Sequence, residues 1–229
     1  MAEVQLLSTW ASAFVMRAEV ALALKGVHYE KLPQDLGNKS ELLLKSNPVY
    51  KKVPVLLHNG RSVCESSIIV QYVDETWPAP KDGADLLPSD PYGKAMARFW
   101  ADYVDKKVFD GALGLLRSVK KGEEEKKAAW ENMVSGMETL ESALAEIGGE
   151  GHFFGGESMG LVDVMLVPLL AWLPAIEEQV GLQIPFADRL PRLEEWFAAC
   201  RAHDVASLLP SSAKISDFIT HILLPRFSS

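Results

Sequence analysis

The chain has 229 residues, of which 48% are hydrophobic and 24% are charged, and its formal net charge at pH 7 is −8. This composition is typical of a soluble globular protein, and it excludes a disordered chain, a collagen-like repeat and a small disulfide scaffold. Because an acidic protein is repelled by the phosphate backbone, we expect no nucleic-acid partner.

Two further properties of the sequence indicate a cytoplasmic protein. Its two cysteines, Cys64 and Cys200, are far apart in the chain, which favours a reducing compartment in which both thiols are free. The first residues lack the basic-then-apolar pattern of a signal peptide, and no transit peptide is apparent. No apolar run approaches the roughly 20 residues that span a bilayer, so we expect no association with a membrane.

A proline-rich stretch divides the sequence near residue 80. The prolines at positions 78, 80, 88 and 91 cannot donate backbone hydrogen bonds, and they restrict the residues before them, which indicates a linker. Residues 1–78 carry no net charge, so the remainder of the chain carries the negative charge. We therefore expect a first domain over residues 1–80, a linker over 81–90 and a second domain over 91–229.

The first domain alternates between strand and helix patterns. Asn59-Gly60 stands between two apolar runs and strongly predicts a hairpin turn, and Gly26 is a natural end for the helix before it. The order β-α-β-α-β-β-α predicts a small α/β domain with helices on both faces of one sheet. The predicted elements are, in chain order, 4–7, 13–25, 27–32, 40–45, 53–57, 62–64 and 66–76.

The second domain shows almost only helical patterns. Residues 161–180 are apolar nearly all round, which predicts a buried central helix that is kinked at Pro168 and Pro174. The predicted fold class is therefore an α/β domain followed by an all-α domain. The expected helical segments include residues 96–104, 126–147, 161–180, 189–200 and 214–223.

Six short motifs, taken together, are more specific than the composition. They are Trp10–Phe14, Asn38–Ser40, Asn47–Leu56, Cys64–Ile69, Tyr72–Trp77 and Arg98–Tyr103. In this order and spacing, they resemble the plant tau-class glutathione transferases over essentially the whole chain. The resemblance implies the cytosolic glutathione transferase fold: a thioredoxin-like N-terminal domain that binds glutathione, then a helical C-terminal domain that contributes a hydrophobic electrophile site. It also implies a homodimer, with glutathione as co-substrate and no metal or other cofactor.

The chain departs from that family at two positions. Ala13 stands where the family commonly has proline after its serine, which removes a preset φ at the start of a helix and puts the placement of the serine in question. Gly160 stands where many members have the Ser or Thr of a capping box with Asp163. The glycine costs a few tenths of a kcal/mol relative to Ser or Thr, and it concerns folding more than chemistry.

Ser12 lies between a predicted strand and a predicted helix. From the residues alone, it is either a plain N-cap or a hydroxyl that donates a hydrogen bond to a thiolate, helped by the positive potential of the helix N-terminus. It is not itself a nucleophile, because no histidine base stands beside it. The resemblance implies the thiolate role, and a serine instead of a cysteine favours conjugation over thiol–disulfide exchange.

The resemblance also implies which residues bind glutathione. The Val53–Pro54 bond is expected to be cis, which turns the backbone of its first residue toward the cysteinyl unit. Glu65 is expected to face the ligand's amino group, and Ser66 to take the γ-glutamyl carboxylate at a helix N-terminus. Lys39 and Lys52 suit the carboxylate at the glycine end, although a lone surface lysine is more often simply solvated.

Apolar and aromatic side chains are expected to line the electrophile site. Residues at helical spacing suit a plain core equally well, so the assignment of each stays open. No metal-ligand spacing, glycine-rich phosphate loop or Ser/His/Asp order stands out. The candidates for the electrophile site are Phe14, Phe109, Leu113, Leu116 and Trp172.

The sequence thus predicts a cytoplasmic glutathione transferase that conjugates the glutathione thiolate to hydrophobic electrophiles, as in xenobiotic detoxification, and leaves glutathione peroxidase activity open. One alternative is a non-catalytic, ligandin-type binder of hydrophobic molecules. Another is a thiol–disulfide oxidoreductase that uses Cys64, against which an inert buried cysteine is the simpler interpretation.

Overall fold

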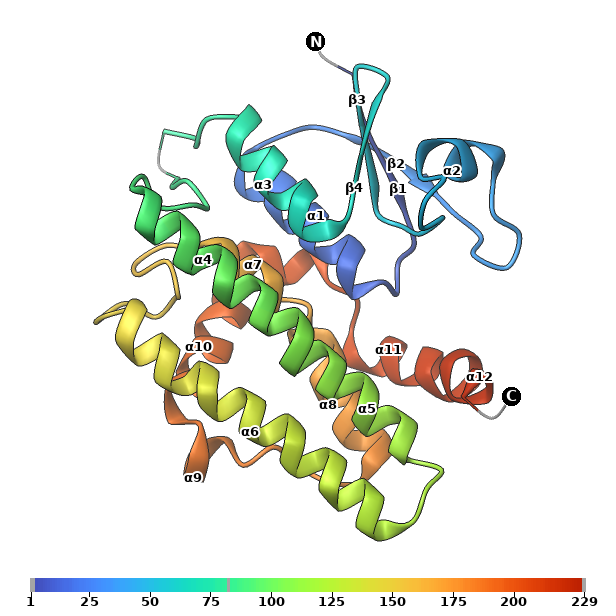
Figure 1. Ribbon diagram of the computed structural model, residues 1–229, viewed down its shortest axis with the longest axis vertical. Helices are drawn as coiled ribbons and strands as arrows, with labels where there is room; N and C mark the ends of the chain where they lie inside the picture. The colour runs from blue at the N-terminus through green and yellow to red at the C-terminus, as the bar shows by residue number, and fades with distance from the viewer. Residues whose placement is uncertain (1–2, 82, 228–229) are drawn as a thin grey trace. The chain divides into compact units, whose positions relative to one another are not determined.

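The protein is described by a computed structural model that covers residues 3–81 and 83–227 (Figure 1). The chain divides into two compact units, residues 1–87 and 88–229, and the division lies inside the stretch that we predicted to be a linker. The first unit combines a sheet with helices and the second is helical, so the predicted fold class is confirmed.

The first unit contains one four-stranded mixed sheet with the strand order β2-β1-β3-β4. The first strand runs parallel to the second and antiparallel to the third, and the third and fourth strands form an antiparallel hairpin. Both hairpin turn residues, Asn59 and Gly60, have positive φ angles, as an Asn-Gly turn requires. The elements are β1 (Val4–Ser8), α1 (Ala13–Leu24), β2 (Glu30–Pro33), α2 (Glu41–Ser46), β3 (Val55–His58), β4 (Arg61–Cys64) and α3 (Ser66–Thr76).

Helices cover both faces of this sheet, as predicted. Leu43 of α2 packs with Leu7 and Val55 on one face. Side chains alternate along a strand, so the neighbouring residues Leu6 and Leu56, which pair across β1 and β3, point to the opposite face. Helices α1 and α3 lie side by side on that opposite face (Figure 1).

The predicted strand over residues 27–32 begins too early, because β2 starts only at Glu30. The end of α1 explains the difference. Gly26 adopts a left-handed φ of 64°, and the Val27 N–H donates to the carbonyl of Leu22 over 2.8 Å. This bond belongs to a Schellman motif that closes the helix, so Val27 is occupied at the helix end and does not pair with β1.

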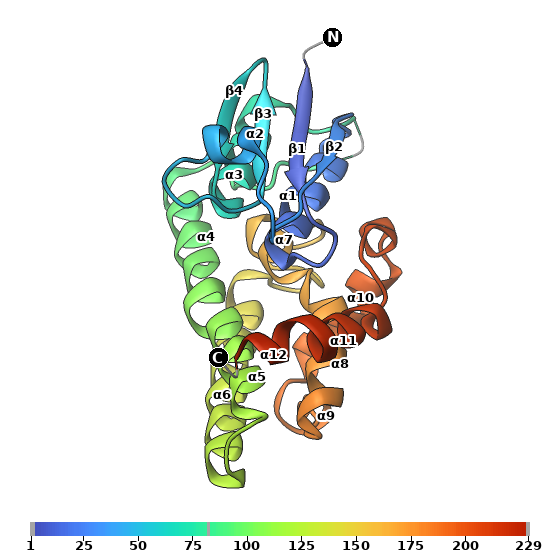
Figure 2. The same ribbon diagram turned by 90° about the vertical axis from the view of Figure 1, so that its right-hand side faces the viewer.

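The second unit is built around a long helical rod, α4–η1–α5, which runs alongside α6 (Figures 1 and 2). Its middle section, η1, is a π-helical turn that the sequence patterns did not reveal. The elements are α4 (Pro91–Tyr103), η1 (Val104–Phe109), α5 (Asp110–Ser118), α6 (Glu123–Ile147), α7 (Leu161–Leu166), α8 (Leu169–Val180), α9 (Phe186–Arg189), α10 (Pro191–Ala202), η2 (Asp204–Leu208), α11 (Ser212–Phe218), η3 (Ile219–Leu223) and α12 (Leu224–Arg226).

The expected central helix over residues 161–180 is buried but interrupted. Its N-terminal part, from Leu161 to Leu169, is entirely buried. At Pro168 the chain breaks into α7 and α8, because proline has no N–H to continue the hydrogen-bond ladder. Pro174, by contrast, lies inside α8. A proline that was expected to kink one helix thus separates two.

A fully buried carboxylate fixes the start of α7. Asp163 accepts hydrogen bonds from the backbone N–H groups of Gly160 (2.8 Å), Phe154 (2.9 Å) and Gly155 (3.0 Å). The indole N–H of Trp196, on α10, donates a fourth bond of 2.7 Å. Burial raises the pKa of Asp163 to about 6, although each of the four donors lowers it. One side chain therefore joins the loop over residues 154–160 to two helices.

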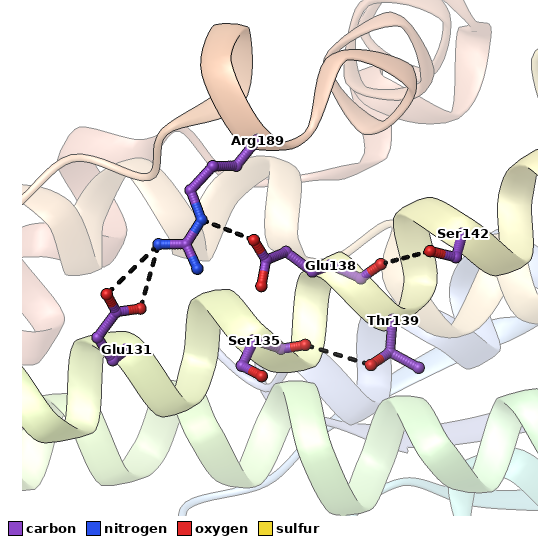
Figure 3. Close-up of polar contacts among 6 residues, drawn as sticks. All are labelled: Glu131, Ser135, Glu138, Thr139, Ser142 and Arg189. Atoms are coloured by element: carbon purple, nitrogen blue, oxygen red, sulfur yellow. Dashed lines mark hydrogen bonds and ion pairs between the residues drawn. The ribbon is translucent and has the colours of Figure 1, made fainter.

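A second polar cluster fastens α9 to α6 (Figure 3). The guanidinium of Arg189 contacts Glu138 through Nε at 2.7 Å and Glu131 through Nη1 at 3.1 Å. The hydrogen bond from Arg189 lowers the pKa of Glu138.

The predicted helix over 189–200 is wrong at its start, because Arg189 belongs to α9 and α10 begins at Pro191.

Among the described residues, no helix is both long and apolar enough to cross a membrane.

Candidate functional site

Ser12 lies at the N-cap of α1, at the loop that follows β1. Its backbone is extended, and its Oγ accepts a hydrogen bond of 3.3 Å from the N–H of Val15. The hydroxyl proton is then available to a ligand, and the side chain is only partly buried. Ala13 is the first helical residue even without the proline that is common in the family, so the departure at this position leaves the helix start in place.

The sheet register brings the predicted glutathione-binding segments together at one end of the strands. Leu7, near the end of β1, pairs with Val55 at the start of β3, and Val55 pairs with Cys64 at the end of β4. The chain leaves β1 and β4 and enters β3 at this end of the sheet. The loop to Ser12, the segment that precedes β3 and the start of α3 therefore emerge together, as the resemblance implies.

The segment before β3 contains the Val53–Pro54 bond, which is cis, as expected. Asn47, only 2% exposed, supports this segment through two hydrogen bonds. Its side-chain amide donates to the carbonyl of Lys52 (3.0 Å), and its Oδ1 accepts from the N–H of Tyr50 (3.0 Å). This role of Asn47 was not predicted from the sequence, although an Asn-Pro pair before a strand is a turn signal.

The start of α3 has an unusual backbone. Glu65 has a positive φ of 69°, a conformation that costs a non-glycine residue free energy and is often retained at functional sites. No side chain caps α3, and its first turn contains no acidic residue. The first backbone N–H groups of α3 are thus suited to bind an external anion such as a carboxylate.

Arg17 is a residue that the sequence analysis missed. It is completely buried on α1, and its Nη1 donates to Ser66 Oγ over 3.3 Å. Its guanidinium carbon also lies 5.0 Å from the ring centroid of Phe14, which is 40% exposed. Arg17 therefore links the Ser12 end of α1 to the start of α3. A charged residue in the mostly apolar sequence of α1 was the available signal.

Lys39 and Lys52 are both exposed. Lys39 directly precedes Ser40, the N-cap of α2, and Lys52 directly precedes the cis bond. Both therefore lie in loops of the first unit, where their ammonium groups are accessible to a carboxylate.

Cys64 has the properties of an inert thiol. Burial raises its pKa, and the charge of Glu65 raises it further. Its Sγ lies 3.5 Å from the carbonyl oxygen of Ser46, in the direction in which a protonated thiol donates. A thiol held in its protonated form is a poor nucleophile.

The apolar candidates of the second unit differ in exposure. Phe109 and Leu116 are buried, with exposed fractions of 7% and 1%. Leu113 on α5 and Trp172 on α8 are partly exposed. The ring of Trp172 meets that of Phe218 on α11 edge to face, with centroids 6.3 Å apart. Helices α5 and α8 pack together, so these side chains belong to one helical layer.

The described residues contain no group of three or more His, Cys, Asp or Glu side chains that could hold a metal ion.

Comparison with known proteins identifies the family. The model of the glutathione S-transferase N-terminal domain matches residues 2–75, and that of the C-terminal domain matches residues 123–199. Glutathione S-transferase U17 of Arabidopsis thaliana is 45% identical over 221 residues, which cover 96% of each chain. Probable glutathione S-transferase GSTU6 of Oryza sativa is 46% identical over 94% of this chain and 92% of its own.

Solved structures agree with this result. The tau-class glutathione S-transferase of mango has a TM-score of 0.88 at 40% identity, covering 97% of this chain and 98% of its own. Rice GST1, in complex with glutathione, has a TM-score of 0.85 at 42% identity, with coverages of 98% and 97%. The matching family models and these relatives together show that this thioredoxin-like unit followed by a helical unit is a glutathione transferase. The chain belongs to the tau class of the glutathione S-transferase family, which confirms the resemblance.

Proposed function

We propose that the protein transfers glutathione to hydrophobic electrophiles, with Ser12 as the residue that stabilises the attacking thiolate. One arrangement carries the proposal. The Ser12 loop, the segment before β3 and the uncapped start of α3 all lie at the same end of the sheet. Family membership supports the same reaction.

The chemistry begins with the ionisation of glutathione. A cysteine-type thiol has a pKa near 8.5, so only a few per cent is thiolate at neutral pH. The Ser12 hydroxyl donates a hydrogen bond to the sulfur, and the N-terminus of α1 adds positive potential, while the thiol proton passes to solvent. The thiolate then attacks the electrophilic carbon, forms the C–S bond and, on a chloro-aromatic substrate, expels chloride.

The remaining site residues hold glutathione in position. Ser66 and the N–H groups at the start of α3 bind the γ-glutamyl carboxylate, and Glu65 faces the amino group. The backbone of Val53 pairs with the cysteinyl unit as an added strand. Lys39 and Lys52 attract the carboxylate at the glycine end.

The electrophile is placed against the sulfur by apolar residues. The side chains proposed to contact it are those of Phe14, Phe109, Leu113, Leu116 and Trp172. Peroxidase activity toward organic hydroperoxides would use the same thiolate, and we keep it as an extension of this proposal.

The experiment that tests the function is an assay of the purified protein with glutathione and a chloro-nitroaromatic. We expect conjugate formation that depends on both substrates. Glutathione binding without turnover of any electrophile in a broad panel would contradict the proposal and favour the ligandin-type carrier.

Arg17 is expected to act through Ser66. Replacing Arg17 with methionine removes the 3.3 Å contact with Ser66 Oγ but keeps an apolar stem of similar length. Since a hydrogen bond from a charged donor is worth about 1.5–3 kcal/mol, glutathione affinity should fall roughly tenfold or more. Titration calorimetry measures this change, and circular dichroism checks that the variant is folded. Unchanged affinity would show that Ser66 needs no orientation by Arg17.

Cys64 is expected to be dispensable. Because burial and Glu65 keep its thiol protonated, replacement by serine should leave kcat and KM for conjugation near their wild-type values. Steady-state kinetics and a disulfide-reductase assay measured on the same preparation check this. Disulfide-reductase activity that disappears in Cys64→Ser and survives Ser12→Ala would establish the oxidoreductase alternative.

We also propose a homodimer and a cytoplasmic location. Exposed aromatic side chains in each unit, such as Tyr50 at 58% and Tyr92 at 74%, suit burial against a second copy of the chain. Sedimentation velocity at low micromolar concentration should report twice the mass of one chain.

A further inference from the structure

The last residues of the first unit are held by a buried carboxylate that the proposed mechanism does not use. Asp74, on α3, accepts the backbone N–H of Leu86 through Oδ1 at 2.7 Å and that of Leu87 through Oδ2 at 3.1 Å. Both leucines are buried but lie outside any helix or strand. Buried N–H groups in irregular backbone need acceptors, and Asp74 supplies both.

A buried lysine completes this cluster. Lys25 Nζ lies 2.7 Å from Asp74 Oδ1 and 2.7 Å from Asp85 Oδ1, and its side chain is 0% exposed. Burial opposes the charged form of Lys25, but the hydrogen bonds and charges of the two aspartates outweigh it and raise its pKa. Asp85 itself is 64% exposed, so Asp74 is the buried partner of the ion pair.

The arrangement connects three parts of the first unit that are distant in sequence. Lys25 is the C-cap of α1, Asp74 lies in the last turn of α3, and residues 85–87 are the last of the unit before the division at Pro88. The two helices that carry Ser12 and Ser66 at their N-termini are therefore joined at their other ends to the point where the chain leaves the unit.

We infer that Asp74, with Lys25, is a positioning residue for glutathione transfer: it fixes the point from which the chain leaves the thiolate-binding unit for the electrophile-binding unit. The inference rests on the proposed division of the two substrates between the units. Displacement of reacting groups by about 1 Å can cost as much as 100-fold in rate, so a fixed exit point contributes directly to turnover.

The test compares Asp74→Ala with Asp85→Asn. The first removes both N–H acceptors and the buried ion-pair partner, whereas the second weakens the exposed ion pair and leaves Asp74 in place. Hydrogen exchange measured by mass spectrometry reports on the amides of Leu86 and Leu87, and steady-state kinetics and calorimetry report on each substrate separately. Thermal unfolding confirms that each variant is folded, and Asp74→Asn, which keeps one acceptor oxygen, replaces Asp74→Ala if the alanine variant does not fold.

In Asp74→Ala, the amides of Leu86 and Leu87 should exchange roughly tenfold faster or more. The kcat/KM for the electrophile should fall about tenfold while the dissociation constant of glutathione stays unchanged. Asp85→Asn should match the wild type in all three measurements. Asp74→Asn should change in the same direction as the alanine variant, by less.

Unchanged exchange in Asp74→Ala would overturn the inference, because the exit segment would then be held by something else. Loss of glutathione affinity in step with turnover would also overturn it, since Asp74 would then act on the fold of the first unit. If the wild type conjugates glutathione and Asp74→Ala does so equally well, only the positioning role fails. If the wild type conjugates no electrophile, the proposed function fails, and the positioning role fails with it.

Discussion

Replacing Ser12 with alanine is expected to lower kcat for conjugation by about 10- to 100-fold, because a charge-assisted hydrogen bond to the thiolate is worth roughly 1.5–3 kcal/mol. The same loss should raise the pKa of bound glutathione by about one to two units, since one unit corresponds to 1.36 kcal/mol. Glutathione affinity should change much less, because the contacts at the start of α3 and at Val53 remain.

The measurement is a pH titration of the thiolate's ultraviolet absorbance in the binary complex, together with the pH dependence of kcat. Ser12 also caps α1, so a matched control is needed for the loss of the cap itself. Ser211 caps α11 through the same type of bond, to the N–H of Lys214 at 3.3 Å, and lies in the second unit. Ser211→Ala should keep wild-type turnover, and Ser12→Thr, which keeps a hydroxyl, should recover part of it.

The result that contradicts the mechanism is also specific. If the bound sulfur in the wild type ionises no more readily than free glutathione, Ser12 is a plain N-cap. The bond to Val15 would then be its complete role, and Ser12→Ala would cost about 1 kcal/mol of stability and little activity.

The parts of the fold that the sequence predicted correctly are those with local signals. Helix α3 has the predicted bounds, and α2 lies within one residue of its prediction because Ser40 marks its start. The Asn59-Gly60 turn fixed the hairpin. In each case the deciding interaction lies within a few residues of the signal, so no knowledge of the tertiary structure was needed.

Errors arose where backbone groups are used by distant or unexpected partners. Because Val27 forms the Schellman hydrogen bond, β2 begins three residues later than predicted. Pro168 separates α7 from α8, where a single kinked helix was expected. The π-helical turn η1 has no composition that separates it from an α-helix. Short periodic patterns do not report such changes in hydrogen bonding.

The same distinction applies to the site. Residues in the family motifs, such as Ser12 and Ser66, could be proposed from the sequence. The role of Arg17 could not, because it comes from a partner far along the chain: Arg17 and Ser66 are 49 positions apart. A buried Arg in a mostly apolar helix therefore indicates that a polar partner exists, without showing which one.

Replacing Asp163 with alanine is expected to give the largest loss of stability. Four N–H donors would lose their acceptor at once, and each unsatisfied buried donor costs about 1–3 kcal/mol, so a loss of about 4 kcal/mol or more is expected even after relaxation. For a chain of this size, that loss corresponds to a decrease in Tm of about 8–16 °C.

Thermal unfolding followed by circular dichroism measures this change, with Asp188→Ala as the control, since Asp188 is an exposed acidic residue on α9 of the same unit. The control should unfold within a few degrees of the wild type. The departure at Gly160 makes Asp163 more important here: a glycine N-cap has no side chain to hold the first turn of α7, so the carboxylate is the side chain that joins this turn to the preceding loop and to Trp196. An Asp163→Ala protein that is as stable as Asp188→Ala would mean that water replaces the carboxylate at all four donors.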